Sequence, residues 1–179
     1  MPVAVSDAGP LIHLSQVDRL DLLLSLFGTV LVTGSVKVEA FDEGIRLGCP
    51  DAEAIGRALN AGWLKIEQLP VRFAKSVAKL AGGENVSHAD AEVLLLARAK
   101  KAKFLVDEKL LSDLAKMYGL QVWSTWTLLL ESQSRKLISL ADLEAVVGEL
   151  GKKKFRLNAQ QTAQILLAAE IIENKNKRR

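Results

Sequence analysis

Short apolar runs alternate along this chain with longer segments in which apolar residues recur at helical spacing. The apolar runs predict five strands, at residues 3–6, 29–33, 63–69, 103–108 and 120–123. The segments between them predict helices, within residues 10–27, 35–41, 50–62, 71–83, 87–101 and 109–119. After the last strand the pattern is helical throughout, with helices expected at residues 126–136, 139–150 and 158–172.

This alternation of strands and helices is typical of βαβ units. Parallel strands are buried on both sides, which explains why the predicted strands are apolar at nearly every position. We therefore predict an α/β fold in which helices cover both faces of a mostly parallel sheet of about five strands. Nothing in the pattern suggests a repeat or a linker, so we expect one domain over residues 1–172 and a frayed basic tail at residues 173–179.

Composition narrows the class of protein. The chain has 179 residues and is 49% hydrophobic, which suits a single folded domain and argues against disorder. Its single cysteine, Cys49, cannot form an intramolecular disulfide, and the start of the sequence lacks the pattern of a secretory signal. No apolar run approaches the ~20 residues that a membrane-spanning helix needs. We expect a cytoplasmic protein.

Charge is distributed unevenly along the chain. Residues 1–99 carry 9 Lys and Arg against 12 Asp and Glu, whereas residues 100–179 carry 15 against 9. The basic half contains the run KKKFR, in which Lys152, Lys153, Lys154 and Arg156 are candidate RNA contacts. Ordinary solvated surface explains the same run equally well.

Four acids fall where the strands of this fold would end. Asp7 follows the first predicted strand and Asp107 closes the fourth, while Glu39 and Asp90 lie in the first turns of helices. Ligands of open α/β sheets bind beyond the carboxyl ends of the strands, so all four carboxylates could face one crevice. Two carboxylates ~4 Å apart repel by about 4 kcal/mol at an effective dielectric of 20, and a divalent cation would offset that repulsion. Oxygen ligands favour Mg²⁺ or Mn²⁺.

Each acid also has a purely structural interpretation. Asp90 could complete a capping box with Ser87, Glu39 could interact favourably with a helix dipole, and Asp107 could cap the helix that follows it. Asp7 is harder to explain in this way, because Pro10 and apolar residues crowd it. The order of the four acids along the chain is therefore more informative than any one of them.

In these segments the chain resembles a PIN domain of the prokaryotic, toxin-like branch, over roughly residues 3–170. The resemblance rests on VSDAGPLIHLSQVDRLDLL, VLVTGSVKVEAF and HADAEVLLLARAKKAKFLVDEKLLSDLAKMYGLQVWST. It implies a three-layer α/β/α sandwich and a ribonuclease that depends on Mg²⁺ or Mn²⁺, which in many members is the toxin of a toxin–antitoxin pair. Position by position, Asp7, Glu39, Asp90 and Asp107 match the family's acids, which implies that they bind the metal and act in catalysis.

The chain departs from the family pattern at three positions. Gly9 replaces a small hydroxyl residue, Asp90 stands where Glu is more common, and Val106 replaces a polar residue before Asp107. The last change leaves open which groups hydrogen-bond to the acids. The candidates for supporting contacts or additional metal ligands are Ser6, Thr125, Glu92 and Glu108.

Other residues that could carry chemistry are more simply explained by packing. His13 lies in an apolar helix and is expected to pack there, and His88 is expected to be exposed. Trp123 and Trp126 could stack on an unpaired base, but packing in the core or in a dimer is favoured.

Two other enzyme classes with an acidic strand end fit poorly. A two-component receiver would need an aspartate closing the third strand, and a haloacid-dehalogenase-type phosphatase would need a second aspartate two residues after Asp7. We therefore expect an endoribonuclease that hydrolyses phosphodiester bonds of single-stranded or looped RNA with one or two metal ions. A catalytically silent PIN-like module that binds RNA or protein is the alternative. Apolar C-terminal helices predict a homodimer or an antitoxin complex.

Overall fold

The sheet is five-stranded and wholly parallel, with the order β3-β2-β1-β4-β5. The structure is a computed structural model and describes residues 3–153 and 157–178. Its strands are β1 (Ala4–Ser6), β2 (Val30–Val32), β3 (Leu64–Ile66), β4 (Lys103–Leu105) and β5 (Val122–Trp123). The predicted α/β fold is confirmed, and each strand lies within a predicted apolar run.

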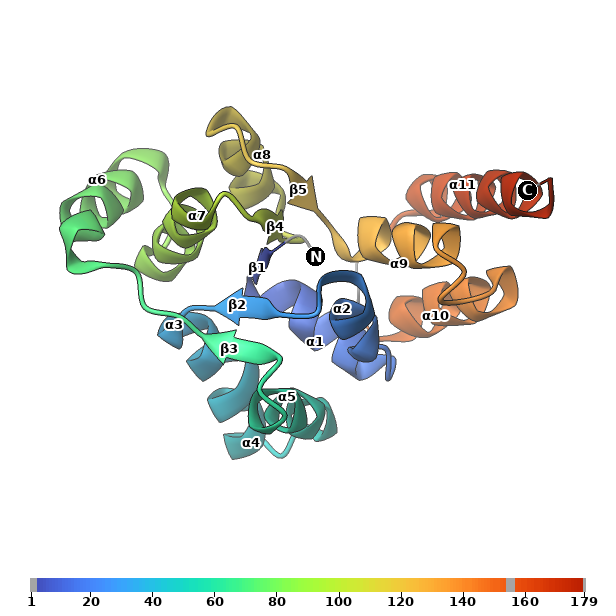
Figure 1. The fold of residues 1–179 in the computed structure, drawn as a ribbon, viewed down its shortest axis with the longest axis horizontal. Helices are drawn as coiled ribbons and strands as arrows, with labels where there is room; N and C mark the ends of the chain where they lie inside the picture. Colours follow the sequence, from blue (N-terminus) through green and yellow to red (C-terminus); the bar gives the residue numbers. More distant parts are fainter. Residues whose placement is uncertain (1–2, 154–156, 179) are drawn as a thin grey trace.

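Helices cover both faces of the sheet (Figure 1). The connections from β1 to β3 cover one face with α1 (Ala8–Gln16), α2 (Asp21–Phe27), α3 (Gly34–Lys37), η1 (Val38–Asp42), α4 (Glu43–Arg46) and α5 (Pro50–Asn60). The other face carries η2 (Val71–Phe73), α6 (Ala74–Glu84), α7 (His88–Lys100) and α8 (Lys109–Met117). Helix α7 packs directly on β1 and β4, and its run from Val93 to Ala97 is fully or almost fully buried.

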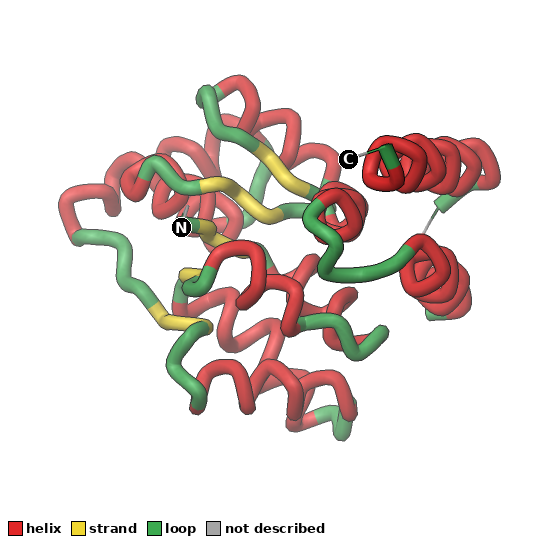
Figure 2. Tube along the Cα trace, turned by 45° about the vertical axis from the view of Figure 1, so that its right-hand side comes forward, coloured by secondary structure: helices red, strands yellow, loops and turns green. Residues whose placement is uncertain are grey.

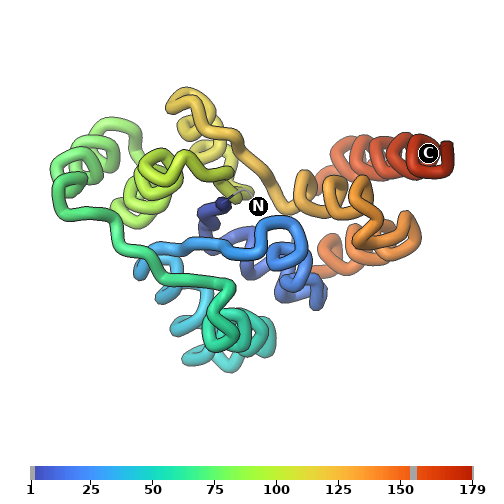
Figure 3. Tube along the Cα trace, viewed as in Figure 1, coloured from blue at the N-terminus to red at the C-terminus, as the bar shows by residue number. Residues whose placement is uncertain are grey.

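Three helices follow the sheet: α9 (Thr125–Ser134), α10 (Leu140–Lys152) and α11 (Ala159–Lys177). They lie beside one another at one side of the sheet, as Figures 2 and 3 show from two directions. The side chain of Gln133 donates through Nε2 to the carbonyl of Ala169, and Asn176 donates to the carbonyl of Gln133. These bonds join α9 to α11. Residues 173–177, expected to be a frayed tail, belong to α11.

Strands β1 and β4 mark the point where the chain reverses its direction across the sheet. Strands β1, β2 and β3 follow one another outward to one edge, and the chain then returns to place β4 on the other side of β1. The backbone amide of Asp7 donates to the carbonyl of Leu105 at 2.9 Å, which joins the two strands at their carboxyl ends. In open α/β sheets this switch point opens the crevice that binds ligands.

Two local predictions about helix ends were wrong for identifiable reasons. Thr33 caps the helix after β2 in place of Ser35, because its hydroxyl accepts the amide of Val36. Helix α6 was expected to end at Gly82 and Gly83 but continues to Glu84, and Asn85 in the left-handed conformation ends it. Asn tolerates that conformation well, so glycine was not needed there.

No helix in the described parts of the chain is both long enough and apolar enough to cross a membrane. This agrees with the interruption of every apolar run in the sequence.

Gly56 in α5 should not tolerate alanine. A Cβ atom at this position would lie 2.7 Å from Cε2 of Phe41, whereas a Cβ at Gly148 in α10 would meet nothing within 4 Å. Overpacking costs about 1–3 kcal/mol, and the gain in helix propensity from Gly to Ala is about 1 kcal/mol. We expect Gly56→Ala to lower the melting temperature and Gly148→Ala to raise it. Gly56→Ala made together with Phe41→Leu should lose most of its penalty, and a penalty that persists there would show that Phe41 is not its cause.

Candidate active site

Asp7 is a half-buried carboxylate at the carboxyl end of β1. It occupies the N-cap position of α1, but its side chain makes no capping hydrogen bond. The pKa of Asp7 is raised from 3.8 to about 6, mainly by burial and to a smaller extent by the negative charges of Glu39 and Asp90. The backbone N–H groups of Ala8 and Gly9 only partly offset this rise. Asp7 therefore lies in a strongly negative environment that favours a proton or a cation.

Glu39 faces the same negative environment from the helix that follows β2. It lies in η1, a single π-helical turn of the kind that often marks a functional site. Glu39 is exposed, yet partial loss of hydration raises its pKa, and Asp90 and then Glu43 add to the rise. Asp7, Glu39 and Asp90 thus form a group of mutually repelling carboxylates contributed by three separate segments.

Asp90 serves as a helix cap without using both of its oxygens. Its Oδ2 accepts the backbone amide of Ser87 at 3.0 Å, and its own amide donates to the Ser87 hydroxyl at 3.0 Å. This is the capping box that the sequence suggested as a structural explanation. Its Oδ1 accepts no hydrogen bond from any residue that the structure describes, so capping and cation binding are compatible.

Asp107 lies two residues beyond β4 and is held by donors from two other elements. Its Oδ1 accepts the amide of Thr125 at 2.7 Å, and its Oδ2 accepts both the Thr125 hydroxyl at 2.6 Å and Nδ1 of His13 at 2.7 Å. The Asp107 side chain is only 11% exposed. Thr125 was a predicted supporting residue, and it is fully buried.

His13 was expected to pack in an apolar helix, and this prediction missed its polar contact. No pattern in the sequence pointed to this contact, because His13 and Asp107 are 94 residues apart. Gly9 lies one helical turn before His13 on α1. A Cβ atom at Gly9 would lie 3.6 Å from Oδ2 of Asp107 and 3.9 Å from the His13 ring. These are ordinary van der Waals distances, so Gly9 lies beside the pair formed by His13 and Asp107 without being required to make room for it.

The four acids are thus not arranged alike. Asp7, Glu39 and Asp90 influence one another electrostatically, whereas the oxygens of Asp107 are directed to Thr125 and His13. Among residues 3–153 and 157–178, no three His, Cys, Asp or Glu side chains are grouped as they would be around a bound metal.

Three of the supporting candidates make contacts of a different kind. Glu92 accepts the hydroxyl of Ser35 at 2.8 Å, which connects α7 to α3. Glu108 caps α8 by accepting the amides of Leu110 and Leu111, a role the sequence had suggested for Asp107. The hydroxyl of Ser6 donates to the backbone carbonyl of Asp7, not to its carboxylate.

The predicted RNA contacts near the end of α10 are only partly described. Lys152 pairs with Glu149 at 2.9 Å, and Lys153 is exposed. Lys154 and Arg156 lie outside the described residues.

Comparisons with known proteins agree with this fold. The model of the family described as DUF3368, a PIN domain, matches residues 3–170. The chain belongs to the PIN-domain family. A search of curated proteins gives no match. The crystal structure of PAE2754 from Pyrobaculum aerophilum is similar with a TM-score of 0.54 and 20% sequence identity, covering 71% of this chain and 92% of that chain. At this identity the likeness concerns the fold alone.

Membership of the PIN family confirms the resemblance seen in the sequence. PIN domains are typically nucleases and usually bind Mg²⁺. In this PIN domain the chemistry of the donors fits such an ion, because Asp7, Glu39 and Asp90 offer carboxylate oxygens and their mutual repulsion would be relieved by a positive charge.

Neutralising Asp7 should stabilise the metal-free PIN domain at high pH. Its folded-state pKa is raised, so between about pH 4 and pH 6 the folded state binds the extra proton and stability falls as pH rises. At pH 8 the ionised carboxylate costs the fold on the order of 3 kcal/mol at most. We expect Asp7→Asn to melt higher than the wild type at pH 8 in a chelator and to differ little at pH 4.

Asp18→Asn provides the matched control, because Asp18 is exposed and Asn tolerates its positive φ of 54°. Mg²⁺ or Mn²⁺ should raise the melting temperature of the wild type and of this control, and should raise that of Asp7→Asn less. Equal shifts in all three proteins would exclude Asp7 from metal binding.

Removing the Thr125 hydroxyl should weaken the hold on Asp107. Thr125→Val deletes one of the three hydrogen bonds to a largely buried carboxylate, which should cost about 2 kcal/mol. Thr125→Ser, which keeps a hydroxyl, should recover most of the loss. Thr127→Val in the same helix removes only a hydroxyl that contacts Ser124 at 3.2 Å and should change stability little. Chemical denaturation of the four proteins measures these differences, and equal losses for the two valine variants would contradict the assignment.

Proposed function

We propose that this PIN domain is a metal-dependent endoribonuclease that hydrolyses phosphodiester bonds of single-stranded or looped RNA. The observation that supports this most is the raised pKa of Asp7, a desolvated carboxylate beside Glu39 and Asp90 at the switch point between β1 and β4. Concentrated negative charge in a ligand-binding crevice is costly to the fold, and such a cost is typical of sites selected for function.

In this proposal Asp7, Glu39, Asp90 and Asp107 hold one or two Mg²⁺ or Mn²⁺ ions. A bound ion would supply positive charge that stabilises the phosphate during hydrolysis and makes water a better nucleophile. The protein's own part is to concentrate the carboxylates. Thr125 and His13 fix the orientation of Asp107, while Ser87 fixes that of Asp90 through the capping box.

The biological setting follows from the family resemblance. We propose that the protein acts as the toxin of a toxin–antitoxin pair, in which a small partner protein covers apolar helical surface. Leu167 and Ile171 on α11 are about half exposed and would suit such a partner or a second copy of the chain. The toxin role would be supported by a neighbouring reading frame that encodes a small DNA-binding protein. Copurification of that protein with this chain would support it further.

One observation favours the alternative of a catalytically silent binding module. Asp107 accepts three hydrogen bonds from protein donors, and no three candidate ligands are grouped around a metal position within the described residues. A silent module would bind RNA without cleaving it in the presence of Mg²⁺ or Mn²⁺.

Cleavage of RNA by purified protein separates the two functions. We expect the wild type to cleave single-stranded RNA with Mg²⁺ or Mn²⁺ and not in a chelator. Asp107→Asn should abolish cleavage while RNA still binds, because it removes a negative charge from the metal site and not from the surface that holds RNA. Asp113→Asn is the control, since Asp113 forms only exposed ion pairs with Lys109 and Lys116.

The rate of cleavage and the affinity for RNA should be measured in the same preparations. Cleavage that survives in Asp107→Asn would point to a contaminating nuclease or to a different site. Binding without cleavage in the wild type would establish the silent module.

A further inference from the structure

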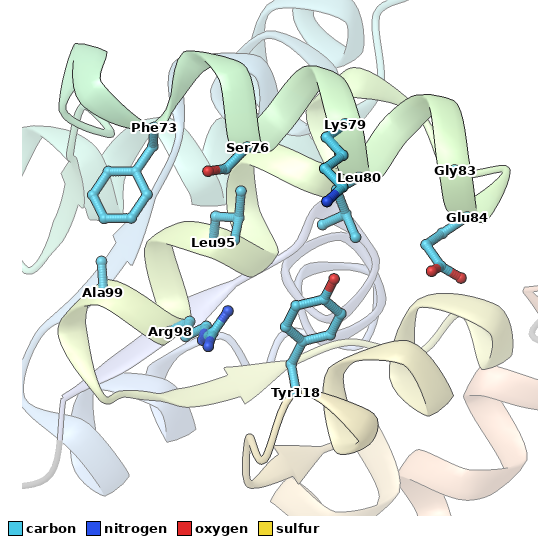
Figure 4. Close-up of a pocket in the computed structure, with 10 residues that line it drawn as sticks. All are labelled: Phe73, Ser76, Lys79, Leu80, Gly83, Glu84, Leu95, Arg98, Ala99 and Tyr118. Atoms are coloured by element: carbon cyan, nitrogen blue, oxygen red, sulfur yellow. The ribbon is translucent and has the colours of Figure 1, made fainter.

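A groove lies on the far side of the sheet from α1, away from the candidate active site. It lies between α6, α7 and the end of α8 and has a volume of about 540 Å³ (Figure 4). Figure 4 shows Phe73 and Lys79 on one wall and Arg98 beside Tyr118 on the other. An adjoining hollow of about 420 Å³ shares Arg98 and Tyr118 and continues to Lys101 and Lys103.

Each of the two aromatic rings that line this groove, Phe73 and Tyr118, has a cation beside it. The guanidinium of Arg98 lies 5.2 Å from the ring centre of Tyr118, and that of Arg72 lies 5.3 Å from the ring centre of Phe73. The apolar side chains of Leu80 and Leu95 complete the lining. Both rings are half-buried, so the part of each ring that faces the groove can stack on a flat base while the cation beside it holds the neighbouring phosphate.

The cations of the groove lack acidic partners. Lys79, Arg98, Lys101 and Lys103 form no ion pair with any described carboxylate, although Lys103 donates to Gln121 and lies 4.2 Å from the ring centre of Trp123. Lys100, by contrast, pairs with Glu67, and Lys152 pairs with Glu149. The groove has one acid in its lining, Glu84. Its unbalanced positive charge suits a polyanion.

We propose that this groove binds a segment of single-stranded RNA, with a base on Tyr118 or Phe73 and phosphates on Lys79 and Arg98. The inference rests on the proposed function and adds a second contact surface to it. Arg98 follows Asp90 by eight residues on α7, which places it about 12 Å along the helix axis from Asp90. The adjoining hollow lies at the amino ends of the strands, opposite the acids, so the groove would hold a part of the RNA at a distance from the crevice.

Single-stranded RNA fits these groups better than a duplex does. Stacking on Tyr118 needs an exposed base face, and duplex pairing hides those faces. The four cations without an acidic partner supply the part of the affinity for RNA that does not depend on base sequence and that falls as the salt concentration rises.

Binding is measured in a chelator, so that cleavage does not interfere, with a short labelled oligoadenylate at two salt concentrations. Lys79→Ala with Arg98→Ala should weaken binding and reduce the salt slope by about 1.4, because each phosphate contact on a single strand contributes about 0.7. Lys175→Ala with Arg178→Ala removes the same charges from exposed positions at the end of α11 and should leave affinity and slope close to wild type.

The aromatic contact has its own pair of variants. Tyr118→Leu should weaken binding on the order of tenfold, whereas Tyr118→Phe keeps the ring and should bind like the wild type. Melting temperatures of all variants check the fold. The exposed lysine and arginine variants keep the proposal testable if Tyr118→Leu does not fold.

Several outcomes would overturn the proposal. These are an unchanged salt slope in the Lys79 and Arg98 variant, equal losses in its control, duplex RNA binding as tightly as the single strand, or inorganic polyphosphate competing as well as oligoadenylate. The measurements distinguish a failure of the proposed nuclease activity from a failure of the proposed RNA binding in the groove. A wild type that never cleaves, but binds through these residues, would refute the nuclease alone, whereas normal cleavage with unaltered binding in every groove variant would refute the groove alone.

Discussion

The buried carboxylate of Asp107 holds together three parts of the chain that are far apart in the sequence. It follows β4, accepts the amide and hydroxyl of Thr125 at the start of α9, and contacts His13 on α1. A carboxylate with so little exposure would be costly without these donors. The position of α9, and of the helices α10 and α11 that pack with it, therefore depends on the charge at the carboxyl edge of the sheet.

The same edge concentrates negative charge that the fold itself does not need. Burial raises the pKa of Asp7, and Glu39 and Asp90 are close enough to raise it further. In metal-free protein this is a cost, which a bound cation would turn into binding free energy. The π-helical turn at Glu39 is a further irregularity at this place, where regular α-helix would be expected to be more stable.

Helix α7 connects the two charged regions of the molecule. Its first turn carries Asp90 and its last turn carries Arg98 and Lys100. This order suits the helix dipole, which favours acids at the N-terminus and cations at the C-terminus. Helix α7 thus separates the carboxylates of the candidate active site, which suit a metal ion, from the cations of the groove, which suit phosphate. The apolar residues between them, from Val93 to Ala97, pack on β1 and β4 and fix the spacing.

The sequence by itself determined the parallel α/β fold, because five apolar runs between helical segments can be buried in few other ways, and it determined that Asp7 and Asp107 follow two of the strands. The sequence left open whether those strands, β1 and β4, are neighbours, which the strand order settles. It could not decide how each carboxylate is used. The capping box at Asp90 was visible in the sequence, but the sequence did not show that one oxygen of Asp90 stays free of it. The cap at Glu108 depends on which of two adjacent acids turns toward α8, and the contact of His13 with Asp107 joins residues 94 positions apart. The unpaired cations around Tyr118 were equally hidden, because whether a lysine has a partner is decided by packing of separate helices and not by its neighbours in the chain.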